Sequence, residues 1–171
     1  MSRVAAVSRT FTGERSDAAG APHPVDVEDT VEAVMATAPG AIGTLSASRL
    51  AAGHRCGSGF EITGSKGSVR WEFQRMNDLD LHLDEGAPEL QGWRTVSVTR
   101  PGLHPWADAW WGGGHVLGYE ETFVHQVVEL LRHLGGEGNQ VPTFEEGVAV
   151  QRVLDAIEAS AQSGSWLSVG R

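Results

Sequence analysis

The order of hydrophobic patterns along the chain constrains its fold most strongly, because strand-like segments come first and helix-like segments come last. About seven runs alternate apolar and polar residues with the period of two that a half-buried strand requires. They lie at 3–11, 25–36, 42–50, 60–63, 69–73, 79–83 and 93–98, with a last short one at 166–169. The Glu and Ala content of residues 25–36 leaves a helix open there. Residues 12–25 are rich in Gly, Pro and Ser and predict an exposed loop.

Two helices are predicted in the last third of the chain. The first begins at Tyr119, carries apolar residues at spacings of three and four, and ends at Gly135. The second begins with a capping box formed by Thr143 and Glu146 and ends at Gly164. Short turns containing glycine make the consecutive strands antiparallel neighbours. We therefore expect an α+β fold in one domain, residues 1–171, with a large, mostly antiparallel sheet that carries helices on one face and is open on the other.

The charge and cysteine content exclude several classes of protein. The chain has 13 Lys and Arg against 22 Asp and Glu, a formal net charge of −9, and the basic residues are scattered. This balance argues against a nucleic-acid or anionic-membrane partner, which needs a local excess of cations. No stretch approaches the roughly 18 apolar residues of a membrane span. A single cysteine, Cys56, forms no internal disulfide, so we expect a cytoplasmic protein.

No common nucleotide-binding or zinc-binding motif occurs in the sequence. The glycine cluster Gly112-Gly113-Gly114 lies in a tryptophan-rich loop and lacks the G-x-G-x-x-G spacing that places a pyrophosphate at a helix N-terminus. Neither a Walker sequence nor paired cysteines are present. The chain therefore carries no dinucleotide site of the common kind, and no metal site is predicted.

The segment from 104 to 125 has the composition of a binding site. It holds three tryptophans, one tyrosine, three histidines and two glutamates in a loop and the following helix start. Aromatic walls with a few polar groups are how proteins bind sugars and other polyols, whose C–H faces lie on rings while imidazoles and carboxylates bind the hydroxyls. The alternative is that the tryptophans fill gaps in the core and the histidines lie on the surface. The functional interpretation is favoured for His115 and Tyr119, which lie beside glycines that permit close approach.

Other polar groups are weaker candidates. Glu121, His125 and Glu129 repeat every fourth residue of the first helix, which suits a metal pair or an acid–base relay but is more often a solvated helix face with weak ion pairing. Polar residues also follow two strands, where they line a pocket or lie on the surface: Arg49, His54, Arg55, Arg75 and Asn77. Cys56 has no neighbour that would activate it and is expected to be buried or idle.

Several stretches together resemble the C-terminal domain of the Gfo/Idh/MocA oxidoreductases, the glucose–fructose oxidoreductase and inositol dehydrogenase family. The matching stretches cover nearly the whole chain in order: 40–49, 60–69, 75–79, 110–120 and 151–157. The most specific are the Gly-Ser-Lys-Gly turn at 64–67 and the Gly-His-x-x-Gly-Tyr-Glu stretch at 114–120.

The resemblance implies a domain that works together with another one. Family members have an N-terminal Rossmann domain that binds NAD or NADP, and the second domain contributes part of a sugar or polyol pocket. The open face of its sheet is used for dimer or tetramer contacts. The catalytic Lys belongs to a Glu-Lys-Pro motif, which this chain lacks, and the helix with the Asp-x-x-x-His motif is expected before Arg3. No catalytic, cofactor-binding or metal-binding residue is therefore assigned, and the isolated chain is expected to be inactive.

The resemblance assigns substrate-binding residues to this sequence. It implies that His115, Tyr119 and Glu120 face the substrate and that Trp110 and Trp111 form walls. Two weaker candidates are Arg49 and the stretch 53–56. The sequence departs from the family at Gly112 and Gly113, where prolines are expected, so the loop should be more mobile. It also reads Gly-His-Arg-Cys at 53–56 instead of Gly-Arg-Lys-Asn, which puts a sugar contact there in doubt.

The sequence thus predicts the substrate-binding and oligomerisation domain of an NAD(P)-dependent sugar or polyol dehydrogenase. Its partners would be the sugar or polyol and, through the open sheet face, a second copy or a subunit with a Rossmann domain. The alternative is a standalone, non-enzymatic module for self-association or subunit docking. A third hypothesis is an independent lyase or isomerase that uses Glu120, Glu121 and His125 as acid–base groups.

Overall fold

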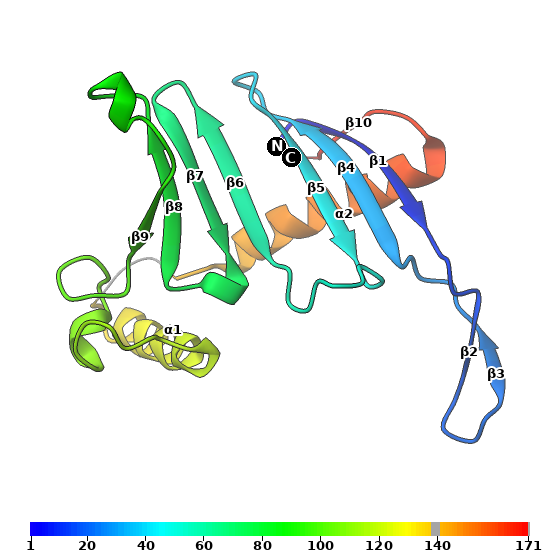
Figure 1. Ribbon diagram of the computed structural model, residues 1–171. Coiled ribbons are helices and arrows are strands. Elements are labelled where there is room, and N and C mark those ends of the chain that lie inside the picture. The colour runs from blue at the N-terminus through cyan, green and yellow to red at the C-terminus, as the bar shows by residue number, and fades with distance from the viewer. Residues whose placement is uncertain (138–140, 171) are drawn as a thin grey trace. The chain divides into compact units, whose positions relative to one another are not determined.

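The computed structural model describes residues 1–137 and 141–170, which form two compact units (Figure 1). The terminal unit comprises Met1–Gly53 and the segment that begins at Pro142, and the inserted unit is His54–Val141. The elements follow in chain order: β1 (Arg3–Arg9), β2 (Glu14–Ser16), β3 (Pro22–Pro24), β4 (Thr30–Ala36), β5 (Ile42–Ser48), β6 (Gly59–Gly64), β7 (Gly67–Glu72), β8 (Asp78–Leu83), β9 (Arg94–Ser97), α1 (Tyr119–Leu134), α2 (Phe144–Ser163) and β10 (Leu167–Ser168).

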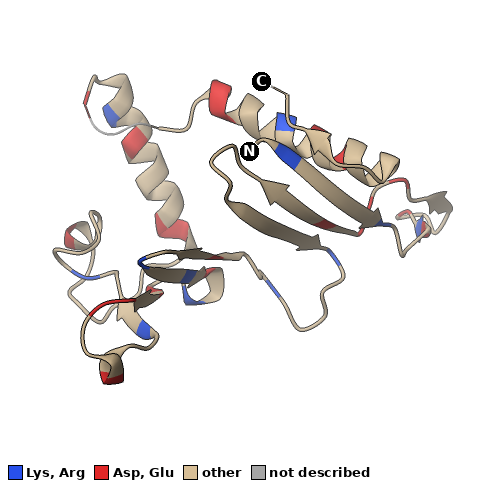
Figure 2. Ribbon diagram, turned by 90° about the horizontal axis from the view of Figure 1, so that it is seen from above, with Lys and Arg blue, Asp and Glu red and all other residues tan. Residues whose placement is uncertain are grey.

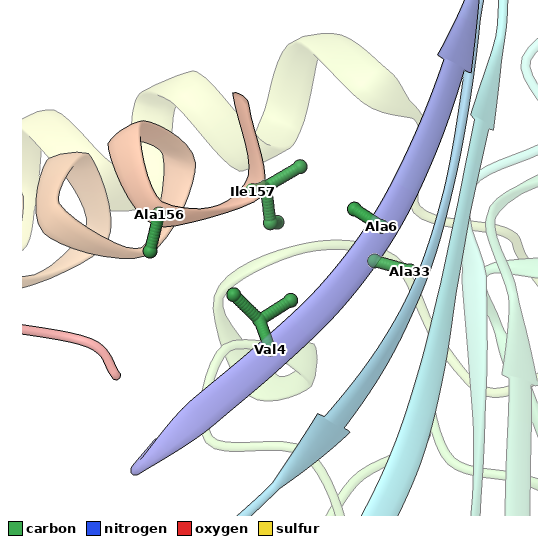
Figure 3. Close-up of a cluster of buried hydrophobic side chains, with 5 residues drawn as sticks. All are labelled: Val4, Ala6, Ala33, Ala156 and Ile157. Carbon is green, nitrogen blue, oxygen red and sulfur yellow. The ribbon is translucent and has the colours of Figure 1, made fainter. Parts of the chain in front are cut away.

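Small residues build the core of the terminal unit. Its four strands pair antiparallel in the order β10-β1-β4-β5, and Ala6 of β1 lies opposite Ala33 of β4. Because side chains alternate across a strand, Val4, Ala6 and Ala33 share one face. Figure 3 shows that α2 covers this face with Ala156 and Ile157. Alanine on both elements lets the helix lie close to the sheet, so dispersion contacts are made along the whole seam.

A buried serine ties α2 to the sheet. The Ser160 side chain is fully buried, and its hydroxyl accepts a hydrogen bond from the backbone N–H of Ala6 at 2.9 Å. The same hydroxyl donates to the carbonyl oxygen of Ser165 at 2.7 Å. It therefore satisfies one backbone group in β1 and another just beyond Gly164, which ends the helix in a left-handed conformation.

The segment between β1 and β4 has more structure than its composition predicts. The sequence indicates an exposed loop over residues 12–25, but β2 and β3 pair there as a short antiparallel ribbon. Asp29, which is buried, accepts hydrogen bonds from the backbone N–H groups of Phe11 and Thr12 at 2.8 and 2.9 Å, and from the Arg15 guanidinium. This long-range anchor, which spacing alone does not reveal, holds the base of the ribbon.

The inserted unit contains the second sheet, in the antiparallel order β6-β7-β8-β9. Its register gives it an apolar face, where Ile62, Val69 and Leu81 are adjacent, and a polar face. On the polar face Arg70 lies 3.1 Å from the Asp80 carboxylate. The β6–β7 turn requires Gly67, whose φ is +149°, because a Cβ there would lie 2.1 Å from the carbonyl oxygen of His82. This explains the second glycine of the Gly-Ser-Lys-Gly turn.

The α+β prediction is confirmed by antiparallel sheets and two helices. The helix starts at Tyr119 and Thr143 are also confirmed, and Glu146 and Thr143 form the expected capping box. The expectation of one large sheet differs from the hydrogen-bonded pairings, which form two four-stranded sheets and the β2–β3 ribbon. β5 and β6 are joined by the segment from Arg49 to Ser58 and belong to different units.

The charged residues are scattered along the chain. Figure 2 shows Lys and Arg at separate places along the ribbon, interspersed with Asp and Glu. Within residues 1–137 and 141–170, neither α1 nor α2 combines the length and hydrophobicity that a membrane span needs.

Ser160→Ala should destabilise the terminal unit by about 1–3 kcal/mol, because it leaves the N–H of Ala6 buried without an acceptor. Urea unfolding followed by circular dichroism measures this change. Ser163→Ala is the matched control, since that side chain makes only a 3.5 Å contact at the end of the same helix. Equal stability of the two variants would contradict a linking role for Ser160.

Candidate functional site

The candidate site lies in the inserted unit, where the loop between β9 and α1 is attached to the sheet. Asn77, just before β8, holds the end of this loop with two hydrogen bonds. Its amide nitrogen donates to the carbonyl oxygen of Leu117 at 2.8 Å, and the N–H of Leu117 donates to its amide oxygen at 2.9 Å. Leu117 is buried, and the next residue, Gly118, donates its N–H to Glu121 at 2.8 Å. Helix α1 therefore starts from a fixed position.

A cluster of aromatic and imidazole rings lies beside this attachment. The indole N–H of Trp110 donates to Nε2 of His125 at 2.6 Å. The Trp106 ring stacks on His125, with centroids 4.7 Å apart and planes 10° apart. His104 approaches His125 with centroids 6.2 Å apart, and its Nδ1 accepts the backbone N–H of Trp106 at 3.2 Å. The cluster brings two of the three tryptophans of the loop onto the first turns of α1.

The half-buried position of His125 changes its acid–base behaviour. Burial lowers the pKa of this imidazole, and nearby His104 lowers the pKa further, while Glu121 acts in the opposite direction. The folded chain therefore takes up this proton less readily than the unfolded chain. The contribution of His125 to stability is complete above the ordinary histidine pKa of about 6.5 and declines as the pH falls below it.

Two hollows next to this cluster are large enough only for small groups. The first, of about 60 Å³, is lined by Met76, Asn77, Thr99, His104, Leu117, Gly118, Thr122 and His125. The second, of about 10 Å³, is lined by Thr99, Ala107, Trp111, His115, Val116 and Leu117. They share Thr99 and Leu117, so they are adjacent. Ligand pockets usually span roughly 300–1,000 Å³, so these hollows suit one hydroxyl or hydroxymethyl group rather than a whole sugar.

His115 and Trp111 lie together at the smaller hollow. Nδ1 of His115 lies 2.9 Å from the carbonyl oxygen of Gly112, and the two rings have centroids 6.4 Å apart. Since a carbonyl oxygen only accepts, this contact places the hydrogen on Nδ1 and leaves Nε2 as an acceptor in the neutral ring. Trp111 is 68% exposed and presents an open ring. An exposed indole beside an imidazole acceptor suits a polyol, whose C–H groups lie on the ring while a hydroxyl donates to Nε2.

The other predicted residues occupy different surroundings. Trp110 is half-buried and bonded to His125, so it is less open than Trp111. Tyr119 is exposed and makes edge contacts with Phe73 and Phe123 at 5.5 and 5.0 Å, and Glu120 is exposed in the first turn of α1. Arg49 belongs to the terminal unit, where its N–H donates to the carbonyl oxygen of Asp29. Of the residues that the family resemblance assigns to the substrate side, Trp111 and His115 line the smaller of the two hollows.

The histidines that line the larger hollow, His104 and His125, are missing from the predicted binding set. The sequence places His125 in a row with Glu121 and Glu129, but Glu121 bonds to Gly118 and Glu129 pairs with Arg132 at 3.3 Å. Among the described residues no group of three or more potential ligands is arranged for a metal ion. Because Nε2 of His125 is occupied by Trp110, an acid–base row on this helix is not formed. The high content of aromatic and histidine residues in 104–125 indicates a site there. It does not indicate which of these side chains contact one another.

The candidate site occurs in a domain that matches known oxidoreductases. The family model of the C-terminal alpha/beta domain of an oxidoreductase family matches residues 1–169. Levoglucosan dehydrogenase of Pseudarthrobacter phenanthrenivorans is 33% identical over 147 residues, which are 85% of this chain and 37% of that protein.

Solved structures match the whole fold. The crystal structure of an oxidoreductase domain protein from Kribbella flavida has a TM-score of 0.93 and 36% identity, covering 99% of this chain and 44% of the other. A structure of levoglucosan dehydrogenase in complex with NADH and L-sorbose has a TM-score of 0.92 and 33% identity, covering 99% and 45%. The chain therefore spans less than half the length of these relatives.

Asn77→Ala should loosen the loop end, because both hydrogen bonds to Leu117 disappear and the buried peptide group loses its partners. The cost should be about 1–3 kcal/mol. Hydrogen exchange of the Leu117 and Gly118 amides measures the local effect. Asn77→Asp keeps the acceptor for the Leu117 N–H and should retain more of the protection. Unchanged exchange in Asn77→Ala would show that the loop end is held by other contacts.

Proposed function

Because the chain belongs to the Gfo/Idh/MocA oxidoreductase family, we propose that it is the substrate-binding and oligomerisation domain of an NAD(P)-dependent sugar or polyol dehydrogenase. The observation that carries the proposal is the pairing of the exposed Trp111 ring with His115 at one hollow. The names of the relatives support a sugar as the ligand, since one is levoglucosan dehydrogenase and its structures include complexes with levoglucosan and with L-sorbose.

In this proposal the chain binds the substrate, and hydride transfer depends on a domain outside it. In residues 1–137 and 141–170 all strand pairings are antiparallel, whereas a Rossmann unit holds its dinucleotide where a helix connects parallel strands. The described residues therefore contain no Rossmann-type dinucleotide site, whereas structures of levoglucosan dehydrogenase, which are more than twice as long as this chain, contain NADH. We therefore place NAD or NADP in a Rossmann domain outside this chain, and propose that the chain alone is inactive.

Each candidate residue has a distinct part in the proposed binding. Trp111 supplies the ring on which the C–H face of the sugar lies, and Nε2 of His115 accepts a hydroxyl hydrogen. Tyr119 and Glu120, which begin α1, offer a phenol and a carboxylate to further hydroxyls. Trp110, which is half-buried, forms a wall of the proposed site. The small volume of the hollows means that this chain contacts one part of the sugar and leaves the rest for residues outside it.

The partner in the proposed oligomer is a second copy that covers the open face of the β10-β1-β4-β5 sheet. The face opposite α2 exposes apolar side chains on three adjacent strands, with Val7 at 66%, Val34 at 45% and Ile42 at 83%. Val34 lies in the middle, between Ala5 and Thr44. Removal of such a patch from water stabilises association by about 25 cal/mol for each Å² of apolar surface.

Sugar binding is tested by titrating the chain with levoglucosan and with L-sorbose while the tryptophan indole and histidine imidazole signals are followed by NMR. The signals of Trp111 and His115 should shift together, and His115→Gln should weaken binding by roughly fivefold, since about 1 kcal/mol of hydrogen bonding is lost. His133→Gln, an exposed residue near the end of α1, is the matched control and should bind like the wild type. Shifts confined to other residues, or none, would reject the proposed site.

Val34→Lys should convert the oligomer into a monomer, because it places a charge in the centre of the proposed contact. Size-exclusion chromatography with light scattering measures the mass of each form. Val27→Lys makes the same change at an exposed valine outside the strands and should keep the wild-type mass. A wild-type monomer at high concentration would contradict self-association through this face.

A further inference from the structure

The contact between Trp110 and His125 fixes the protonation state of the histidine. An indole nitrogen donates and never accepts, so the 2.6 Å bond requires that Nε2 of His125 carries no hydrogen. The ring is then neutral, with its hydrogen on Nδ1. A second proton would place an N–H on Nε2, facing the indole N–H, and the bond would be lost. The geometry therefore makes the position of Trp110 dependent on neutral His125.

Trp106 restrains the imidazole of His125 by stacking on it. His125 and Arg132 are seven residues apart on α1, which is about 10 Å along the helix axis. The Trp106 ring lies 4.7 Å from the His125 centroid and 4.8 Å from the Arg132 guanidinium carbon. The Trp106 indole therefore contacts both side chains. Stacking on this ring restrains the plane of the imidazole, and the Arg132 cation stabilises the position of the indole.

The segment that carries the proposed sugar contacts is anchored to the rest of the inserted unit at both of its ends. Trp110 anchors the front end through His125, and Leu117 anchors the rear end through Asn77. Between them, a Cβ added at Gly112 or Gly113 would meet no atom within 4 Å, and Gly114 has a φ of +95°. Glycines without side-chain contacts restrain the backbone weakly. The front anchor is therefore needed to hold Trp111 and His115 in one arrangement.

We propose that His125 is a positioning residue, which in its neutral form holds Trp110 and thereby keeps Trp111 and His115 in the arrangement that binds sugar. This inference rests on the proposed function, and it makes the affinity for the sugar dependent on pH. His125 acts through its hydrogen bond with Trp110. Protonation of His125 releases the front anchor and weakens sugar binding.

The charged and titratable groups around His125 come from two elements. From the loop before η3 (Ala107–Ala109), His104 approaches the ring and disfavours its protonation, as burial also does. From α1, Glu121 favours protonation, while Glu129 pairs with Arg132, which contacts Trp106. Burial and His104 outweigh Glu121, so the pKa of His125 lies below its usual value and the anchor is intact at neutral pH. The transition falls on the acid side of 6.5.

The test uses the full chain labelled with ¹⁵N on tryptophan and histidine, first without any sugar. At neutral pH the His125 nitrogen shifts should report the tautomer with hydrogen on Nδ1, and the Trp110 indole hydrogen should exchange at least tenfold more slowly than that of Trp111. Acidification should abolish this protection as His125 titrates below 6.5. His125→Gln keeps an acceptor that does not titrate, so protection should persist at acid pH. His125→Phe keeps the stacking but removes the acceptor, so protection should be absent at every pH.

Levoglucosan affinity provides the second readout. It should fall on acidification in the wild type, remain nearly constant in His125→Gln, and be low throughout in His125→Phe. His133→Gln should behave like the wild type in all measurements. Equal protection of Trp110 at neutral and acid pH, or protection that survives in His125→Phe, would overturn the inference. Absence of sugar shifts with the Trp110 protection intact would instead reject the proposed function, so the two failures are distinguishable.

Discussion

The seam between β1 and α2 is the contact on which the chain's organisation depends, because it joins segments more than 150 residues apart. Ser160 bonds to Ala6, and β10 pairs with β1, so both ends of the described chain take part in one sheet-and-helix unit. The inserted unit, His54–Val141, is enclosed in sequence by this contact. Closing so long a loop costs conformational entropy, which the buried alanines, Val4, Ile157 and the two serine bonds must offset.

The loop of the candidate site is held mainly by a few hydrogen bonds at its ends and less by hydrophobic packing. The loop before α1 buries Ala107 and Leu117, while Trp111 and His115 remain open. Asn77 and His125 fix its two ends, and the glycines between them permit close approach of a ligand. Such a site is well suited to one side of a sugar.

Sequence reasoning predicted the elements better than their pairing. The alternation at 69–73 and the capping box at Thr143 depend on neighbours in sequence, and both correspond to observed elements. The β2–β3 ribbon was missed because it depends on Asp29, whose partners lie in another segment. The division into two sheets was missed because alternation marks strands without stating which strands pair. In the site, the sequence names Trp111 and His115, which lie together at one hollow. Asn77 and His125 owe their positions in the site to Leu117 and Trp110, which no spacing rule connects to them.

The central claim is that this chain recognises a sugar while another domain holds the cofactor. Saturation-transfer difference NMR with levoglucosan and NADH present in one sample tests both halves at once. The account predicts transfer from the protein to the sugar C–H groups that lie on Trp111, and none to the adenine or nicotinamide rings. Transfer to NADH, or to neither ligand, would contradict it.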